Sequence, residues 1–174
     1  MSNLYFTPEI VHPKEIWNRV QFMVAKVVNC VANVLPGGFP CDLPMAHPSI
    51  GAFIGYGHIT ATGKMEVLNC STNMTEKDIV LAGNPISDLS PASQVGALFG
   101  KLPNSGVIVV SHNCYPVSGL GTGVTGEATV VDDNKAFSAA ELSDGTACSW
   151  LNAYVAEGIA KWKQGSDGYP CLDL

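Results

Sequence analysis

Residues 50 to 71, IGAFIGYGHITATGKMEVLNCS, decide the fold that the sequence predicts. Two apolar runs, 50–60 and 64–71, are separated by residues 61–63, which have the length and the glycine typical of a short hairpin. We therefore expect two neighbouring antiparallel strands at this point, inside a β-rich middle region.

Three further segments have the composition of strands. Residues 78–82 and 106–111 are short and apolar. In residues 123–132, apolar or glycine positions alternate with polar ones, which is typical of a strand with one buried and one solvent-exposed face. This alternation places Val124 and Val130 on the buried face.

Helices are expected on both sides of these strands. Apolar residues recur every three or four positions over Ile16–Leu35, after a helix start at Pro13. A second stripe, which includes two tryptophans, predicts an amphipathic helix over Ala147–Lys163. Shorter helices are expected over 91–99 and 136–142.

This order of elements predicts an α+β fold whose middle forms a small barrel or a strongly curved sheet. The 174 residues suit a single domain. We divide it into an N-terminal helix with a Pro-rich connector (1–48), the barrel (49–133) and a C-terminal helical segment (134–174).

The composition excludes several classes of protein. Hydrophobic residues make up 47% of the chain and charged residues only 14%, whereas about 25% are charged in an average domain, so disorder is excluded. Nine basic residues against 15 acidic ones leave no basic surface for nucleic acid. The segment Ile16–Leu35 is interrupted by polar residues, so no membrane span is expected.

The cysteines and the N-terminus indicate the compartment. The six cysteines show no CxxC pair and no zinc-type spacing, and we interpret most of them as reduced, half-buried small side chains. The start of the chain lacks the basic and apolar regions of an export signal, which predicts a cytoplasmic protein.

Few side chains are candidates for chemistry, and no metal site is expected. His58, on a predicted strand, and His112, just after one, are candidates for proton transfer because a neutral imidazole exchanges a proton near pH 7. Cys114, close to His112, is a candidate nucleophile. The alternative for all three is a structural role as hydrogen-bonded or buried side chains.

The segment from Gly57 to Asp133 resembles the split β-barrel flavin-binding proteins, which include pyridoxamine phosphate oxidase relatives and small FMN-binding proteins. The resemblance lies in the order of four pieces. These are residues 57–67 (GHITATGKMEV), a short strand leading into 85–99, an apolar strand at 107–111, and the glycine-rich approach to 126–133 (GEATVVDD).

This resemblance implies an antiparallel split barrel, a homodimer and an FMN ring at the interface between the two barrels. It implies that the flavin contacts the second strand, the turn after the third and the glycine-rich entry, at Asn69, Ser71, Thr72, Pro85, Ser87, Ser90, Gly121 and Thr122. The implied activity is that of a flavin-dependent oxidoreductase acting on a small molecule.

One departure from the family keeps a second hypothesis open. Many members hold the flavin phosphate with a cation after the third strand, but this chain has no basic residue between Lys77 and Lys101. The alternative is a non-enzymatic α+β module that binds a small apolar or planar ligand or assembles into an oligomer.

Overall fold

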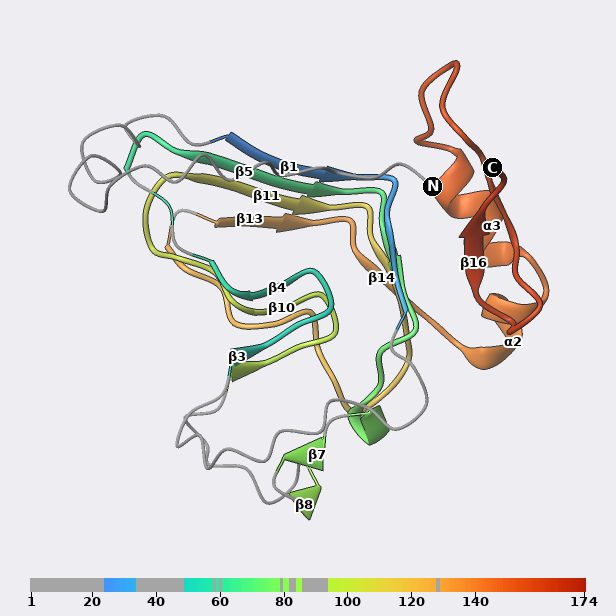
Figure 1. Cartoon of the computed structure of the whole chain (residues 1–174), viewed down its shortest axis with the longest axis horizontal. Helices are drawn as coiled ribbons and strands as arrows, with labels where there is room; N and C mark the ends of the chain where they lie inside the picture. Colours follow the sequence, from blue (N-terminus) through green and yellow to red (C-terminus); the bar gives the residue numbers. More distant parts are fainter. Residues whose placement is uncertain are drawn as a thin grey trace, which may run out of the picture.

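The chain forms stacked parallel coils that end in a C-terminal cap (Figure 1). This description rests on a computed structural model, which describes residues 24–33, 49–57, 59, 61–78, 80–81, 84–85, 94–127 and 129–174. Stacked coils of this kind make a parallel β-solenoid, in which each coil contacts mainly its neighbours.

The first side of the stack is the long sheet. Its strands are β1 (Val24–Val28), β5 (Lys64–Leu68), β11 (Val107–Ser111) and β13 (Thr129–Asp132), hydrogen-bonded in that order and all parallel. These segments are rich in Val and Ile, whose branched side chains suit a pleated surface.

The second side is the short sheet, which the chain enters after a sharp turn at the end of each long strand (Figure 1). Its parallel strands lie in the order β14, β12, β6, β2. Their bounds are Lys135–Phe137 for β14, Cys114–Pro116 for β12, Ser71–Thr72 for β6 and Val31–Ala32 for β2.

The third side returns the chain to the next long strand. Here β3 (Ser49–Ile50) pairs in parallel with β9 (Gln94–Val95), and β4 (Ile54–Tyr56) pairs in parallel with β10 (Phe99–Lys101). Residues 121–124 continue this side, because the N–H groups of Ala97 and Leu98 donate to the carbonyls of Gly121 and Thr122. We number the coils one to four by their long strands.

The second coil carries an excursion after β6. It includes the 3-10 turn η1 (Glu76–Asp78) and a small antiparallel pair, β7 (Val80–Leu81) and β8 (Asn84–Pro85). Asp78 accepts hydrogen bonds from both the N–H and the hydroxyl of Thr75, which closes this turn.

The interior of the stack is filled by inward-facing side chains in register. One row consists of Val27, Val67, Val110 and Val131, at equivalent positions of the four long strands. Ile59, Leu98, Phe99, Leu102 and Ile108 complete this buried core with Cys70. Hydrophobic burial therefore holds each coil against the next.

The cap consists of α2 (Ala139–Ser143), α3 (Thr146–Asn152) and the antiparallel strands β15 (Trp162–Gln164) and β16 (Pro170–Leu172). Ser138 and Glu141 form a capping box at the start of α2, as expected for a helix that begins at a serine. The side-chain amide of Asn152 exchanges two hydrogen bonds, both 2.8 Å, with the backbone of Trp162 and joins α3 to β15.

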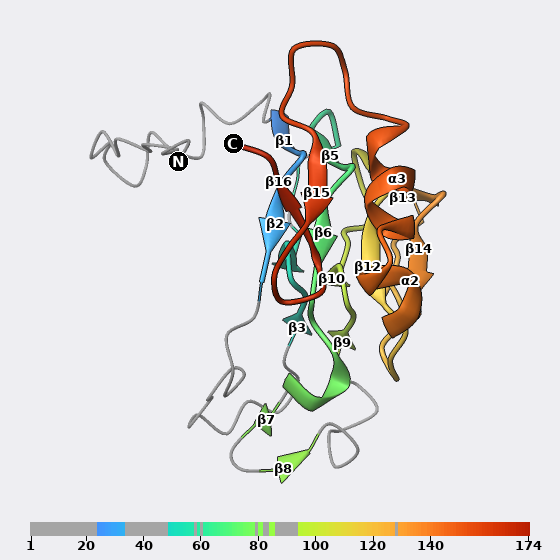
Figure 2. The ribbon, with the colours of Figure 1, turned by 90° about the vertical axis from the view of Figure 1, so that its right-hand side faces the viewer.

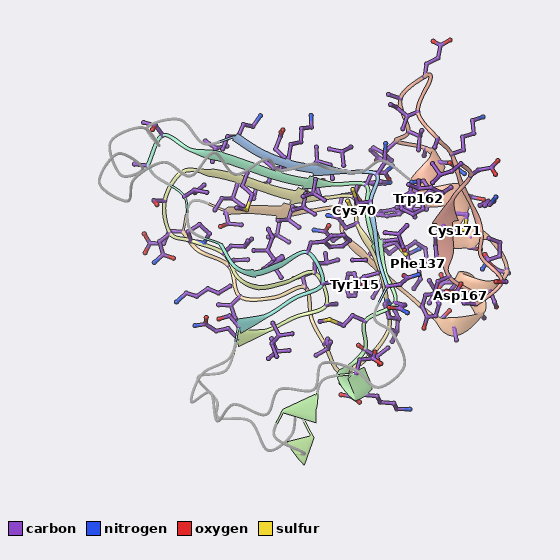
Figure 3. All side chains as sticks on the ribbon, in the orientation of Figure 1. Cys70, Tyr115, Phe137, Trp162, Asp167 and Cys171 are labelled. Carbon is purple, nitrogen blue, oxygen red and sulfur yellow. The ribbon has the colours of Figure 1, made fainter. Side chains whose placement is uncertain are left out.

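The cap lies over the outer face of the short sheet (Figure 2). Phe137 and Cys114 of that sheet and Leu142, Leu151 and Trp162 of the cap form a second buried cluster. Figure 3 places Phe137 and Trp162 on the cap side of the short sheet and Tyr115 on its inner side. The short sheet is therefore covered on both faces, as parallel sheets usually are.

The predicted split barrel is wrong. The described strands form the open parallel sheets of a solenoid and two small antiparallel pairs, with no closed barrel among them. Residues 64–68 pair with β1 and β11 rather than in a hairpin with 50–60. The α+β class with a long N-terminal helix and a C-terminal amphipathic helix is also wrong, because Val24–Val28 is β1 and α3 ends at Asn152. Residues 16–23 of the predicted N-terminal helix lie outside the described residues.

Two smaller expectations are corrected as well. Of the helix predicted over 91–99, residues 94–95 form the strand β9 and residue 99 begins the strand β10, while 91–93 lie outside the described residues. In β13 the buried face is the opposite of the predicted one, because Val130 is 52% exposed while Val131 packs against the core. The predicted strand at 106–111 is confirmed as β11.

Candidate functional site: the coil corner and the open end of the stack

Each coil turns from the long to the short sheet at one corner residue. These residues are Asn29, Asn69, His112 and Asp133, and all four have positive φ angles, between 50° and 57°. Asn, Asp and His enter this left-handed region more readily than other residues with a side chain. The corner therefore explains why these residue types recur at this point of the coil.

The residue after each corner points into the stack, and in the last two coils it is an asparagine. The Oδ1 atom of Asn113 accepts the N–H of Cys70 at 2.9 Å, and its Nδ2 donates to the carbonyl of Val67 at 3.0 Å and to Oδ1 of Asn134 at 2.8 Å. Asn134 in turn donates to the carbonyl of Val110 at 2.8 Å. This amide ladder supplies the backbone partners that the sheets lose where they turn.

In the first two coils the position after the corner is Cys30 and Cys70. The Sγ atom of Cys70 donates to the carbonyl of Leu68 at 3.2 Å, and burial raises its pKa to about 12. Cys114, under the cap, is also fully buried, and burial raises its pKa to about 12. Because the thiolate is the nucleophilic form, burial disfavours nucleophilic attack by either thiol near neutral pH, and the role of Cys114 as a nucleophile stays a prediction.

His112 is held on all sides at the junction of the coils and the cap. Its ring stacks on the indole of Trp150 with 3.5 Å between centroids, and the ring of Tyr154 covers it at 3.2 Å. Its Nε2 lies 3.0 Å from the backbone carbonyl oxygen of Trp150, and its Nδ1 lies 3.1 Å from Oδ2 of Asp133. Both ring nitrogens therefore face oxygen atoms that can accept a hydrogen bond.

Asp133 and Tyr154 close this cluster toward solvent. The Tyr154 hydroxyl donates to Oδ2 of Asp133 at 3.2 Å, and this hydrogen bond to a carboxylate raises the pKa of Tyr154. Neither ring nitrogen of His112 is free to bind a substrate atom in this arrangement. The role of His112 in proton transfer stays a prediction, and its geometry favours a structural role that fastens the cap to the corner.

The described residues that the flavin resemblance selected lie on two sides of the stack. Asn69, Ser71 and Thr72 are buried in the second coil, where Asn69 donates to Asn29 Oδ1 at 2.6 Å and Thr72 donates to the carbonyl of Ala32 at 2.7 Å. Gly121 and Thr122 lie on the third side of the stack, where their carbonyls accept hydrogen bonds from the backbone of the second coil.

The remaining predicted residues are only partly described. Pro85 belongs to β8, whose side chains are not described, while Ser87, Ser90 and His58 lie outside the described residues. Within the described part of the chain there is no group of His, Cys, Asp or Glu side chains suited to a metal ion. No helix of the described residues is long and apolar enough to cross a membrane.

The most unusual feature of the described surface is the end of the stack at the fourth coil. Strand β13 pairs with β11 on one edge, and β14 pairs with β12 on one edge, and no described strand pairs with their other edges. The inward-facing Val131 is half-buried, whereas Val67 and Val110 in the same row are only 1% and 0% exposed. Among the described residues, the fourth coil thus presents an unpaired strand edge and an incompletely covered core.

The sequence carries a signal for these corners in a short repeat. Residues 27–30 (VVNC) recur as 67–70 (VLNC), and equivalent corner asparagines are 40 residues apart. His112 and Asp133 mark a shorter interval of 21 residues. Self-similarity at a fixed spacing is the sequence sign of stacked repeats.

Comparisons of the chain with family models, with curated proteins and with solved structures found no match.

The two buried thiols yield a labelling prediction. With a pKa of about 12, only about one in ten thousand of the Cys70 or Cys114 thiols is ionised at pH 8. Both should therefore react with iodoacetamide far more slowly than the half-buried Cys30 and Cys171. Their labelling rate should rise about tenfold for each pH unit below the pKa, while the protein stays folded. Mass spectrometry of peptides after timed labelling measures these rates. Fast labelling of Cys114 in the folded protein would contradict this prediction and support Cys114 as a nucleophile.

Proposed function

We propose that this chain is a non-enzymatic structural module that assembles with other copies of itself through the open end of its coil stack. The observation that carries the proposal is the fourth coil, whose β13–β14 edge is unpaired among the described residues and whose Val131 is only half-buried. An exposed strand edge is a template for a further strand.

Three other features support a structural rather than a catalytic role. The described interior is filled by apolar side chains and by the Asn113–Asn134 ladder. His112 has both ring nitrogens engaged, and the buried thiols of Cys70 and Cys114 have pKa values of about 12. Low charge, 14% of the residues, suits a protein that buries further surface on assembly.

Assembly predicts a mass that depends on concentration. Sedimentation analysis of the wild-type protein should show the monomer at low concentration and larger species as concentration rises. Val131→Lys should keep the protein monomeric over the same range, because an inward-pointing charge on an edge strand disfavours addition of another strand.

Val117→Lys is the matched control, because Val117 is 65% exposed and lies outside β13 and β14. It adds the same charge and should leave the assembly unchanged. Circular dichroism shows whether each variant is folded. A wild-type protein that stays monomeric at every concentration, or a folded Val131→Lys protein that assembles like the wild type, would refute the proposed function.

A further inference from the structure

We propose that the partner of the β13–β14 edge is the β1–β2 edge of a second copy, added in parallel and head to tail. This inference rests on the proposed function and identifies the surface that the open end binds. In this arrangement the first coil of one copy follows the fourth coil of the next as if it were a fifth coil.

The bend at the corner selects this partner. Both edges consist of a long-sheet strand, a corner residue with positive φ and a short-sheet strand, with Asp133 at one corner and Asn29 at the other. A parallel copy of β1–β2 pairs with both strands of the edge at once, β1 with β13 and β2 with β14. Two β13–β14 edges related by a two-fold axis either pair only one of these strands or place the long-sheet strand of one copy on the short-sheet strand of the other, so they do not continue both sheets.

The register of the coils also continues across this junction. Within the chain, Val27, Val67, Val110 and Val131 occupy one inward row. The two valines at the ends of the row are half-buried, and the two inside it are buried. Head-to-tail stacking places Val27 of one copy on Val131 of the next and covers both incompletely buried ends in one step.

The charges on the outer face of the long sheet differ between the two ends. Lys26 of β1 is in register with Val130 of β13, and its side chain is 57% exposed although its Nζ lies 3.7 Å from a carboxylate oxygen of Glu66 in the same copy. The fourth coil instead carries exposed carboxylates at Glu127, Asp132 and Asp133. Stacking brings Lys26 beside Val130 of the next copy and diagonally close to Asp132, a pairing of opposite charges.

The symmetry of this contact determines the product. A head-to-tail contact uses two different surfaces, so each copy keeps one free edge after joining another. Stacking along a solenoid axis does not close into a ring, and the expected product is an open row of copies rather than a dimer.

The test places a charge at Val130 and measures the association constant by sedimentation at low salt. Val130→Glu faces Lys26 of the next copy, so head-to-tail stacking should become about twofold to fivefold tighter. Val130→Lys should weaken it by a similar factor. The gain from Val130→Glu should disappear in the double variant Val130→Glu, Lys26→Gln, and it should shrink as salt is added.

Val117→Glu and Val117→Lys are charge-matched controls, because Val117 lies outside both edges, and neither should change the association constant. If Val130→Glu weakens association, the two β13 strands meet each other and the head-to-tail inference is overturned, although the proposed function stands. If Val130→Glu still raises the association constant when Lys26 is replaced by Gln, Lys26 is not its partner. The head-to-tail inference is then overturned, although the proposed function stands. A wild-type protein that never associates refutes the proposed function itself.

Discussion

Replacing Asn113 with alanine is expected to lower the free energy of unfolding by about 3 kcal/mol. Asn113 is fully buried, and its amide serves three partners: the N–H of Cys70, the carbonyl of Val67 and Oδ1 of Asn134. Alanine removes all three bonds and leaves buried backbone groups of the second coil without a partner, which costs about 1–3 kcal/mol for each such group. Chemical denaturation followed by circular dichroism measures the change.

Asn104→Ala is the control for this prediction, because Asn104 is exposed on the turn before β11. It should change the free energy of unfolding by less than about 0.5 kcal/mol. If Asn113→Ala is as stable as Asn104→Ala, the amide ladder does not stabilise the corner and the account of the coil turn is wrong.

Gly123→Ala is expected to cost about 3–5 kcal/mol or to prevent folding. Gly123 has a φ of 141°, which side-chain-bearing residues rarely adopt, and a Cβ atom there would overlap with the carbonyl oxygen and ring of Phe99. Phe99 belongs to the buried core of the second coil, so it has no free space into which to move. Thermal melting of the purified protein measures the effect.

Gly121→Ala provides a matched comparison two residues away. A Cβ atom on Gly121 meets no atom within 4 Å, so this variant should melt within a few degrees of the wild type. Equal stability of the two variants would contradict the close contact of the third coil with the second. Because Gly121 is also a residue that the flavin resemblance selected, a flavin titration of Gly121→Ala and of the wild type tests that earlier expectation in the same preparation.

The local composition of the strands was predictable, but their partners were not. The apolar segments at 64–68 and 107–111 are strands, as their Val and Ile content indicates. A short apolar run carries no information on whether its neighbour is parallel and distant or antiparallel and adjacent. The spacer at 61–63 suggested a hairpin, whereas it joins the third side of one coil to the long sheet of the next.

The predicted N-terminal helix shows how two buried faces imitate a helical period. Val27 packs against the interior of the stack, while Val31 packs beneath the cap. The corner at Asn29 lies between them, so apolar residues appear four positions apart although both belong to strands. Because the short sheet is covered on both faces, apolar residues on either side of the corner have the spacing of one helix face.

The predicted C-terminal helix has a similar explanation. Trp150 and Tyr154 both contact His112, and Trp162 is buried in the cap as part of β15. Gly158, with a φ of 81°, lies in the turn region between α3 and β15. These aromatic residues recur at helical spacing, but two of them contact His112 at the corner and the third is buried in the cap.

The corner and the open end could have been located from the repeat of VVNC at 27–30 and VLNC at 67–70. That repeat predicts equivalent positions in stacked coils. The third and fourth corners use His112 and Asp133 instead of asparagine, so the pattern weakens there. Which strands form the two edges of the stack is visible only once the described strands are in register.

The most direct test of end-to-end assembly is electron microscopy of the concentrated wild-type protein. The four coils of the described residues, at a strand spacing of about 4.8 Å, predict rods with an axial repeat of about 19 Å per copy and the same polarity along their length. Particles with a two-fold axis, or compact closed oligomers of any size, would contradict the account.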